Sequence, residues 1–207
     1  MINSGLNNTP LFNALKKYIS DRPTPFHMPG HKLGKGFPAD FLENIAALDL
    51  TEIAGTDNLH FPSGPIKEAQ DLAAEAFGSK NSFFLVNGST CGIHAIIMTI
   101  CKPGDKLIVS RDCHKSVIGG LMLAGASPVY IRPEFNYDFG ISAVVKVSEI
   151  ENALRLHPDA AGVLITRPNY YGICSDIRAI AELVHSYGKV LAVDEAHGAH
   201  LKFHSAL

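Results

Sequence analysis

The last recognisable element of the sequence reads VLAVDEAHGAH, from Val190 to His200, and it carries Asp194 at the tip of an apolar run. A carboxylate in this position could bind a metal ion, belong to a motif of an NTPase, or pair with the protonated ring nitrogen of a cofactor. It could equally be a buried aspartate whose hydrogen bonds serve only the fold. The surrounding motifs decide among these four roles.

Spacing disfavours two of the roles. An NTPase needs a phosphate loop of the form GxxxxGK followed by Ser or Thr. The nearest string, GHKLGKG at 30–36, is one residue short, has glycine where the hydroxyl belongs, and follows no strand pattern. His197 and His200 flank a turn, but the sequence has no HExxH motif and no cysteine at ligand spacing, which disfavours zinc. We therefore expect no metal at this site.

A second candidate site is VNGST, at residues 86–90, where a strand pattern gives way to a helix pattern. Gly88 permits a sharp turn, and Ser89 and Thr90 place hydroxyl groups beside the unpaired N–H groups of the helix start. That end of a helix carries about half a positive charge and suits a phosphate group. The alternative is an ordinary helix N-cap, which serine and threonine form in many proteins.

A third candidate is His114, in the string RDCHKS, which opens another predicted helix. A single histidine at a helix start is commonly a cap or a surface group. Its position after a predicted strand favours a ligand contact instead, because ligands of open parallel sheets bind beyond the carboxyl ends of the strands. Both roles remain open at this point.

These motifs punctuate an alternation of strands and helices that begins near residue 81. Short β-branched or aromatic runs predict five strands, at 82–86, 106–110, 128–132, 162–166 and 189–193. Helical patterns lie at 91–100, 115–124, 147–156 and 176–187. The alternation indicates an α/β fold, a three-layer sandwich in which helices cover both faces of one mostly parallel sheet. The polar strand tips should then share one edge, at a switch point in the strand order.

The first 80 residues differ from this pattern. Helical stretches at 10–19, 40–47 and 65–77 are separated by Pro- and Gly-rich segments. We therefore predict two parts: an N-terminal arm and cap at 1–64, and a sheet domain at 65–207.

Composition narrows the class of protein. The net charge is −2, without a basic run, which argues against nucleic acid as a partner. No apolar stretch approaches the roughly 18–20 residues needed to span a bilayer. The four cysteines form no CxxC pair, and the N-terminal residues lack the pattern of a secretory signal. We expect a cytoplasmic enzyme with free thiols.

Taken together, the motifs carry a resemblance to a known family. VNGST, DCHKS, TRPNYYG and VDEAHGAH, in this order, resemble the fold-type I pyridoxal phosphate enzymes. TPFHMPGHK and TDNLHFPSGPI narrow the resemblance to the ornithine/lysine/arginine decarboxylases, from about Pro10 to the last residue. The resemblance implies pyridoxal 5'-phosphate as cofactor, a basic amino acid as substrate, a role in polyamine biosynthesis, and a homodimer or higher homo-oligomer.

The resemblance also implies residue roles, which concern Gly88, Ser89, Thr90, His114, Asp194, Ala196 and His197. The loop matching Gly88–Thr90 holds the cofactor phosphate. The residue matching His114 stacks on one face of the pyridine ring, and the residue matching Ala196 lies near the other face. The aspartate matching Asp194 bonds the ring nitrogen, and the histidine matching His197 lies near the phenolic oxygen. A close carboxylate raises the pKa of the ring nitrogen by roughly one to three units.

The family's Schiff-base lysine follows the DEAH segment, in a Ser-x-His-Lys motif that this sequence lacks. Lys202 lies only eight residues after Asp194, too close to reach a neighbouring parallel strand. We therefore expect an N-terminal fragment of a longer decarboxylase that is inactive alone. Other fold-type I enzymes (an aminotransferase or a lyase) and a non-catalytic cofactor-binding module remain alternatives. The specific substrate stays open, with Glu52 and Asp57 as acidic candidates or as solvated loop residues.

Overall fold

A computed structural model of the protein describes residues 9–203. The chain divides into two compact units, Met1–Lys67 and Glu68–Leu207. The division falls inside helix α3 (Pro65–Phe77), so the helix continues from one unit into the next. The boundary that we expected between residues 64 and 65 therefore stays a prediction.

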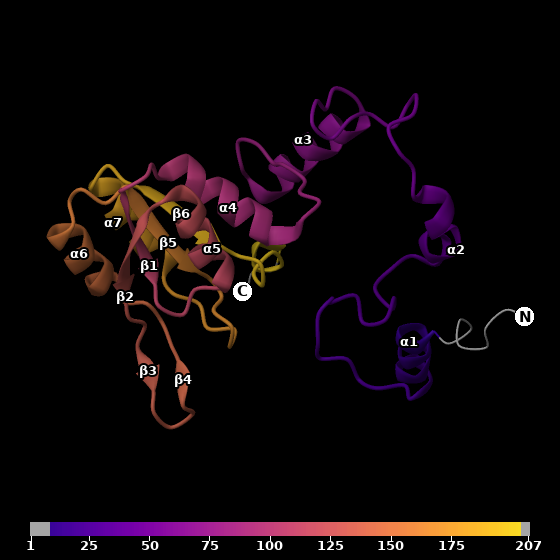
Figure 1. Ribbon diagram of the computed structural model, residues 1–207, viewed down its shortest axis with the longest axis horizontal. Helices are drawn as coiled ribbons and strands as arrows, with labels where there is room; N and C mark the ends of the chain where they lie inside the picture. Colours follow the sequence, from indigo (N-terminus) through magenta and orange to yellow (C-terminus); the bar gives the residue numbers. More distant parts are fainter. Residues whose placement is uncertain (1–8, 204–207) are drawn as a thin grey trace, which may run out of the picture. The chain divides into compact units, whose positions relative to one another are not determined.

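The second unit is built on a four-stranded parallel sheet in the order β2-β1-β5-β6 (Figure 1). Its strands are β1 (Lys106–Ser110), β2 (Ser127–Ile131), β5 (Gly162–Thr166) and β6 (Val190–Asp194). The chain passes outward from β1 to β2, and then returns to the other side of β1 for β5 and β6. The connection after β1 runs to one side of the sheet and the connection to β5 runs to the other side. The switch point of the strand order therefore lies between β1 and β5, where a ligand site is expected.

Helices cover both faces of this sheet. The bounds of the four helices are α4 (Gly88–Ile100), α5 (Lys115–Ala124), α6 (Val147–Leu156) and α7 (Ile177–Ser186). Alternate residues of each strand enter separate cores, so that Leu107 and Val109 pack with α4 and α5, and Ile108 packs with α6 and α7. Figure 1 shows the same layers, with α6 and α7 opposite α4 and α5. The expected three-layer α/β fold is confirmed.

One predicted strand is wrong. Residues 82–86 lie in the connection before α4 and form no strand. Their apolar side chains are largely in solvent, with Phe83 76% and Val86 77% exposed. A strand requires a neighbouring chain that pairs with its N–H and C=O groups, and none lies beside this segment in residues 9–203. A composition rich in β-forming residues is therefore not enough to make 82–86 a strand, because no strand of the described chain pairs with it.

A short hairpin was not predicted. It consists of β3 (Phe135–Asn136) and β4 (Ile141–Ser142), paired antiparallel, and it extends away from the parallel sheet (Figure 1). The Asn136 side chain accepts hydrogen bonds from the N–H groups of Asp138 and Phe139, which closes the turn. Strands of two residues are too short to leave an alternating pattern.

The first unit contains α1 (Pro10–Ser20), α2 (Ala39–Leu48) and the start of α3. Neither α1 nor α2 has a buried residue. Before α3, the Asp57 carboxylate accepts N–H groups of Ser63, Gly64 and Ile66. Backbone hydrogen bonds, that of Ser63 first, lower the pKa of Asp57 to about 2. Asp57 is thus a capping residue of the loop and helix.

A short 3-10 turn, η2 (Leu201–Phe203), ends the described chain. None of the helices between residues 9 and 203 has the length and apolar character to cross a membrane.

Candidate functional site

The carboxyl edge of the parallel sheet holds a cavity of about 460 Å³. The start of α4 and the loops after β1, β5 and β6 form its walls. Its lining residues are Ser89, Thr90, Asp112, Cys113, His114, Lys115, Ser116, Thr166, Tyr170, Asp194, Ala196 and His197. Three strand tips and the starts of two helices, α4 and α5, therefore meet at a single site, as expected of an open parallel sheet.

The α4 side of the cavity offers backbone donors. Ser89 and Thr90 line it from the first turn of α4, and Asn87 at the N-cap makes no side-chain capping bond. The N–H groups of this turn are therefore left for a ligand or for water. Gly88 adopts a φ of 65°, which favours glycine, but Gly88 does not line the cavity itself.

Asp194 lies at the end of β6 and is only 6% exposed. Its Oδ1 accepts the N–H of Ala196 at 3.1 Å, and its carboxylate makes no other hydrogen bond within the described residues. Asp194 pairs in register with Thr166 on β5, so both side chains emerge on the same face of the sheet. One carboxylate oxygen is thus available to a ligand in the cavity.

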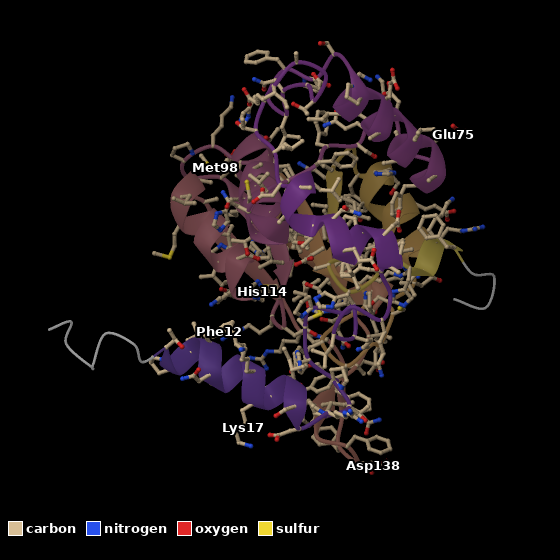
Figure 2. The ribbon with its side chains drawn as sticks, turned by 90° about the vertical axis from the view of Figure 1, so that its right-hand side faces the viewer. Phe12, Lys17, Glu75, Met98, His114 and Asp138 are labelled. Carbon is tan, nitrogen blue, oxygen red and sulfur yellow. The ribbon has the colours of Figure 1, made fainter. Side chains whose placement is uncertain are left out.

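His114 joins the cavity to α5. It is the N-cap of α5, and its Nδ1 accepts the N–H of Ser116 at 3.2 Å. The side chain also lines the cavity, and Figure 2 labels it. The cap and the ligand contact were alternatives in the sequence, yet the structure assigns His114 a cap and a place in the cavity wall together.

The turn after β6 brings Ala196 and His197 to the cavity. Gly198 keeps this turn against the loop after β5, because an added Cβ at Gly198 would lie 2.8 Å from Cδ of Pro168. Arg167 and Glu195 form an ion pair of 3.0 Å between the same two loops. Backbone packing and charge therefore fix the turn.

Six lining residues were not anticipated: Asp112, Cys113, Lys115, Ser116, Thr166 and Tyr170. The alternation of side chains along a strand could have indicated Thr166, since it ends β5 as Asp194 ends β6. The Thr166 Oγ1 is buried and has no hydrogen-bond partner. Burial, followed by the charge of Asp112, raises the pKa of the Cys113 thiol, so Cys113 is a thiol rather than a thiolate in this wall.

No group of three or more His, Cys, Asp or Glu side chains in the described chain is arranged to hold a metal ion. The expectation of a metal-free site stays a prediction.

Comparisons with known proteins show which proteins this chain is similar to. A sequence model described as "Orn/Lys/Arg decarboxylase, major domain" matches residues 9–207. The arginine decarboxylase of Bacillus subtilis (strain 168) is 44% identical over 205 residues, which make up 97% of this chain and 42% of that protein. The lysine decarboxylase LdcA of Pseudomonas aeruginosa is 30% identical over 217 residues, with 94% of this chain and 29% of that protein covered.

The fold is also found in solved structures. Lysine decarboxylase A from Pseudomonas aeruginosa superposes with a TM-score of 0.69 at 29% identity, over 95% of this chain and 29% of that chain. The chain therefore spans less than half the length of the relatives that it matches. Since the family match extends over nearly the whole sequence, the chain belongs to the Orn/Lys/Arg decarboxylase family.

Proposed function

We propose that this chain forms the pyridoxal phosphate site of a decarboxylase that acts on arginine, lysine or ornithine. The cavity at the carboxyl edge of the sheet carries the proposal, because it combines a helix start, an imidazole ring and a buried carboxylate. The relatives named arginine decarboxylase and lysine decarboxylase support the substrate class.

The residues present fit this cofactor. The free N–H groups at the start of α4 and the hydroxyls of Ser89 and Thr90 suit its phosphate. The available oxygen of Asp194 suits a protonated ring nitrogen. The buried hydroxyl of Thr166 in the cavity wall has no hydrogen-bond partner in the described chain. An unused polar group of this kind is expected where a polar ligand binds.

Each residue has a distinct task in this proposal. Asp194 holds a proton on the ring nitrogen, and its burial strengthens that interaction by excluding water. His114 supports one face of the ring, and Ala196 with His197 bounds the site on the β6 side. When bound, pyridoxal phosphate supplies an electron-accepting ring for the electron pair left by departing carbon dioxide.

The chain alone is proposed to be inactive in turnover, because its sequence contains no Ser-x-His-Lys segment. Assembly as a homodimer or higher homo-oligomer, a cytoplasmic location and a role in polyamine biosynthesis are parts of the same proposal. The exposed apolar side chains of α1, such as Leu11 and Ile19, are consistent with an assembly.

The decisive experiment is a titration of the chain with pyridoxal phosphate, followed by absorbance and by quenching of tyrosine fluorescence. We expect saturable binding that weakens at least tenfold for pyridoxal, which lacks the phosphate, the equivalent of about 1.4 kcal/mol. Asp194→Asn should weaken binding of pyridoxal phosphate by a similar factor, since it removes a charge-assisted hydrogen bond. Asp176→Asn is the matched control, because Asp176 caps α7 through the N–H of Ala179 and does not line the cavity.

Equal affinities for pyridoxal and pyridoxal phosphate would contradict the phosphate site. An Asp194→Asn variant with unchanged affinity would contradict the role of the carboxylate. Carbon dioxide release from arginine, lysine or ornithine by the chain alone would contradict its proposed inactivity.

A further inference from the structure

Two hydrogen-bond donors of Ser116 meet the same nitrogen of His114. The backbone N–H of Ser116 lies 3.2 Å from Nδ1, and the Ser116 Oγ lies 2.9 Å from it. A backbone N–H can only donate, so Nδ1 must present its lone pair to the start of α5. The hydroxyl then also donates to Nδ1, and the proton of the neutral ring resides on Nε2.

The Ser116 hydroxyl makes no hydrogen bond in the described chain other than that to His114, although Ser116 also lines the cavity. Ser116 is the second residue of α5 and is only 4% exposed. Helix N-caps are usually Ser, Thr, Asp or Asn, whose short side chains reach the helix amides directly. A histidine cap instead ties an aromatic ring to the helix start, at a place where the ring also lines the cavity.

We propose that Ser116 is a positioning residue, which fixes the tautomer and the orientation of the His114 ring in the cavity wall. With Nδ1 held by α5, the ring plane is fixed and Nε2–H is the ring's remaining donor. The partial positive charge at the start of α5 favours this arrangement, because it faces a lone pair rather than a proton.

The consequence for the ligand rests on the proposed function. A flat neutral imidazole can stack on a protonated pyridine ring, whereas an imidazolium would repel it. Ser116 therefore acts on cofactor affinity through His114, and it needs no contact of its own with the cofactor. A residue that acts in this way should lose its effect when the imidazole is absent.

The first test uses the chain labelled with ¹⁵N-histidine and long-range ¹H–¹⁵N spectra, with the His114 signal assigned by its loss in His114→Phe. We expect an unprotonated Nδ1 and a protonated Nε2 in the wild type. Ser116→Ala should shift this balance partly toward mixed tautomers, because only the longer backbone hydrogen bond of 3.2 Å then holds Nδ1. Ser116→Thr retains the hydroxyl and should retain the wild-type signal. A predominant Nδ1–H tautomer in the wild type, or an unchanged signal in Ser116→Ala, would overturn the proposal.

The second test is a double-mutant cycle on pyridoxal phosphate affinity. Ser116→Ala should weaken binding about fivefold in the wild-type background, the size of one net hydrogen bond, and not at all in the His114→Phe background. Equal losses in both backgrounds would show that Ser116 acts by packing or by its own contact with the ligand, and would overturn the proposal.

A matched control separates positioning from stability. Ser175 is another buried serine, 7% exposed, whose Oγ accepts the N–H of Val145 at 2.9 Å and which does not line the cavity. Ser175→Ala should lower the stability and leave the affinity unchanged. If the wild type itself binds no pyridoxal phosphate, the proposed function fails, and the tautomer spectra still decide the role of Ser116.

Discussion

At the scale of single residues, Asp194 and His114 divide their atoms between the fold and the cavity. Asp194 uses one oxygen for the N–H of Ala196 and leaves the other free, and His114 uses Nδ1 for α5 and leaves its ring in the wall. A side chain held in this way is ordered before a ligand arrives, which reduces the entropy lost on binding. The structural and the ligand-binding interpretations of these residues are therefore compatible.

Thr166 is expected to lower the stability of the ligand-free chain. Its Oγ1 is buried without a partner, which costs about 1–3 kcal/mol relative to a satisfied or solvated hydroxyl. Thr166→Val keeps the shape and removes the polar atom, so we expect the free energy of unfolding to rise by about 1 kcal/mol. Urea denaturation, with an unchanged slope, measures this.

Thr99→Val is the matched control for Thr166→Val. The Thr99 hydroxyl donates to the carbonyl of Ala95 at 2.7 Å on an exposed part of α4, so its removal should bring no gain. A Thr166→Val variant that is less stable than the wild type would show that the hydroxyl has a partner in solution.

The sequence indicated much of this site, but only where a motif carried it. Of the seven residues expected, only Gly88 lies outside the lining of the cavity. Thr166 and Ser116 were missed, although the alternation of side chains along β5 could have indicated Thr166. Serine and threonine are common at the surface, and the burial that sets these two residues apart arises from packing between segments distant in sequence.

At the scale of elements, the loops at the carboxyl edge hold one another in place. The Asn169 side chain, 5% exposed, donates to the carbonyls of Ser142 and Ala143, which ties the loop after β5 to the β3–β4 hairpin. The Arg167–Glu195 ion pair ties the same loop to the turn after β6. The cavity wall is therefore a connected set of loops, as rigid sites require.

Gly198 provides a test of this connection. An added Cβ would lie 2.8 Å from Cδ of Pro168 and 3.0 Å from the carbonyl oxygen of Arg167, so the turn with Ala196 and His197 must shift. We expect Gly198→Ala to destabilise the chain by about 1–3 kcal/mol, the usual cost of overpacking, and to weaken pyridoxal phosphate binding. Thermal denaturation and the ligand titration measure the two effects.

A glycine with free space is the control for Gly198. Gly30 has no heavy atom within 4 Å of an added Cβ, so Gly30→Ala should change neither quantity. Wild-type stability in Gly198→Ala would mean that the two loops can separate at little cost.

Asp57 gives the first unit a pH dependence. Backbone hydrogen bonds, that of Ser63 first, lower its pKa from 3.8 to about 2. A carboxylate with a lowered folded pKa stabilises the fold above its unfolded pKa, and this contribution is lost as the pH falls through the folded pKa. We therefore expect Asp57→Asn to be less stable than the wild type above about pH 5, and the difference to narrow as the pH falls toward 2.

Urea denaturation over this pH range measures the difference. Asp49→Asn is the control, because Asp49 accepts no hydrogen bond in the described chain and should show no such convergence. A difference between Asp57→Asn and the wild type that is as large at pH 2 as at pH 5 would indicate that the loop, rather than the charge, is altered.

The elements themselves were predictable to different degrees. Strands β1 and β5 and helices α3, α5 and α6 agree with the sequence prediction to the residue, since their apolar faces and turn residues are local signals. Residues 82–86 have strand composition and no partner, and pairing is a property of two segments. The prediction failed where the state of a segment depends on its neighbour.

At the scale of the whole molecule, apolar burial is concentrated in the sheet unit. Both buried clusters belong to Glu68–Leu207, whereas α1 and α2 bury nothing. The chain also spans only 42% of the arginine decarboxylase of Bacillus subtilis that it matches. Exposed apolar side chains promote association between chains once they form a continuous patch of roughly a few hundred Å².

The segment 82–86 is the sharpest test of such association. Phe83 and Val86 are 76% and 77% exposed in a segment that pairs with no strand of the described chain and whose backbone can pair with a second chain. We expect the 207-residue polypeptide to self-associate, with a sedimentation coefficient that rises with concentration. The double variant Phe83→Lys with Val86→Lys should reduce this rise, because charge opposes edge pairing. Phe61→Lys, which replaces an 82% exposed side chain in another loop, is the control and should leave the rise largely intact. A wild type that sediments as a monomer at all concentrations would show that this segment is tolerated in solution without a partner.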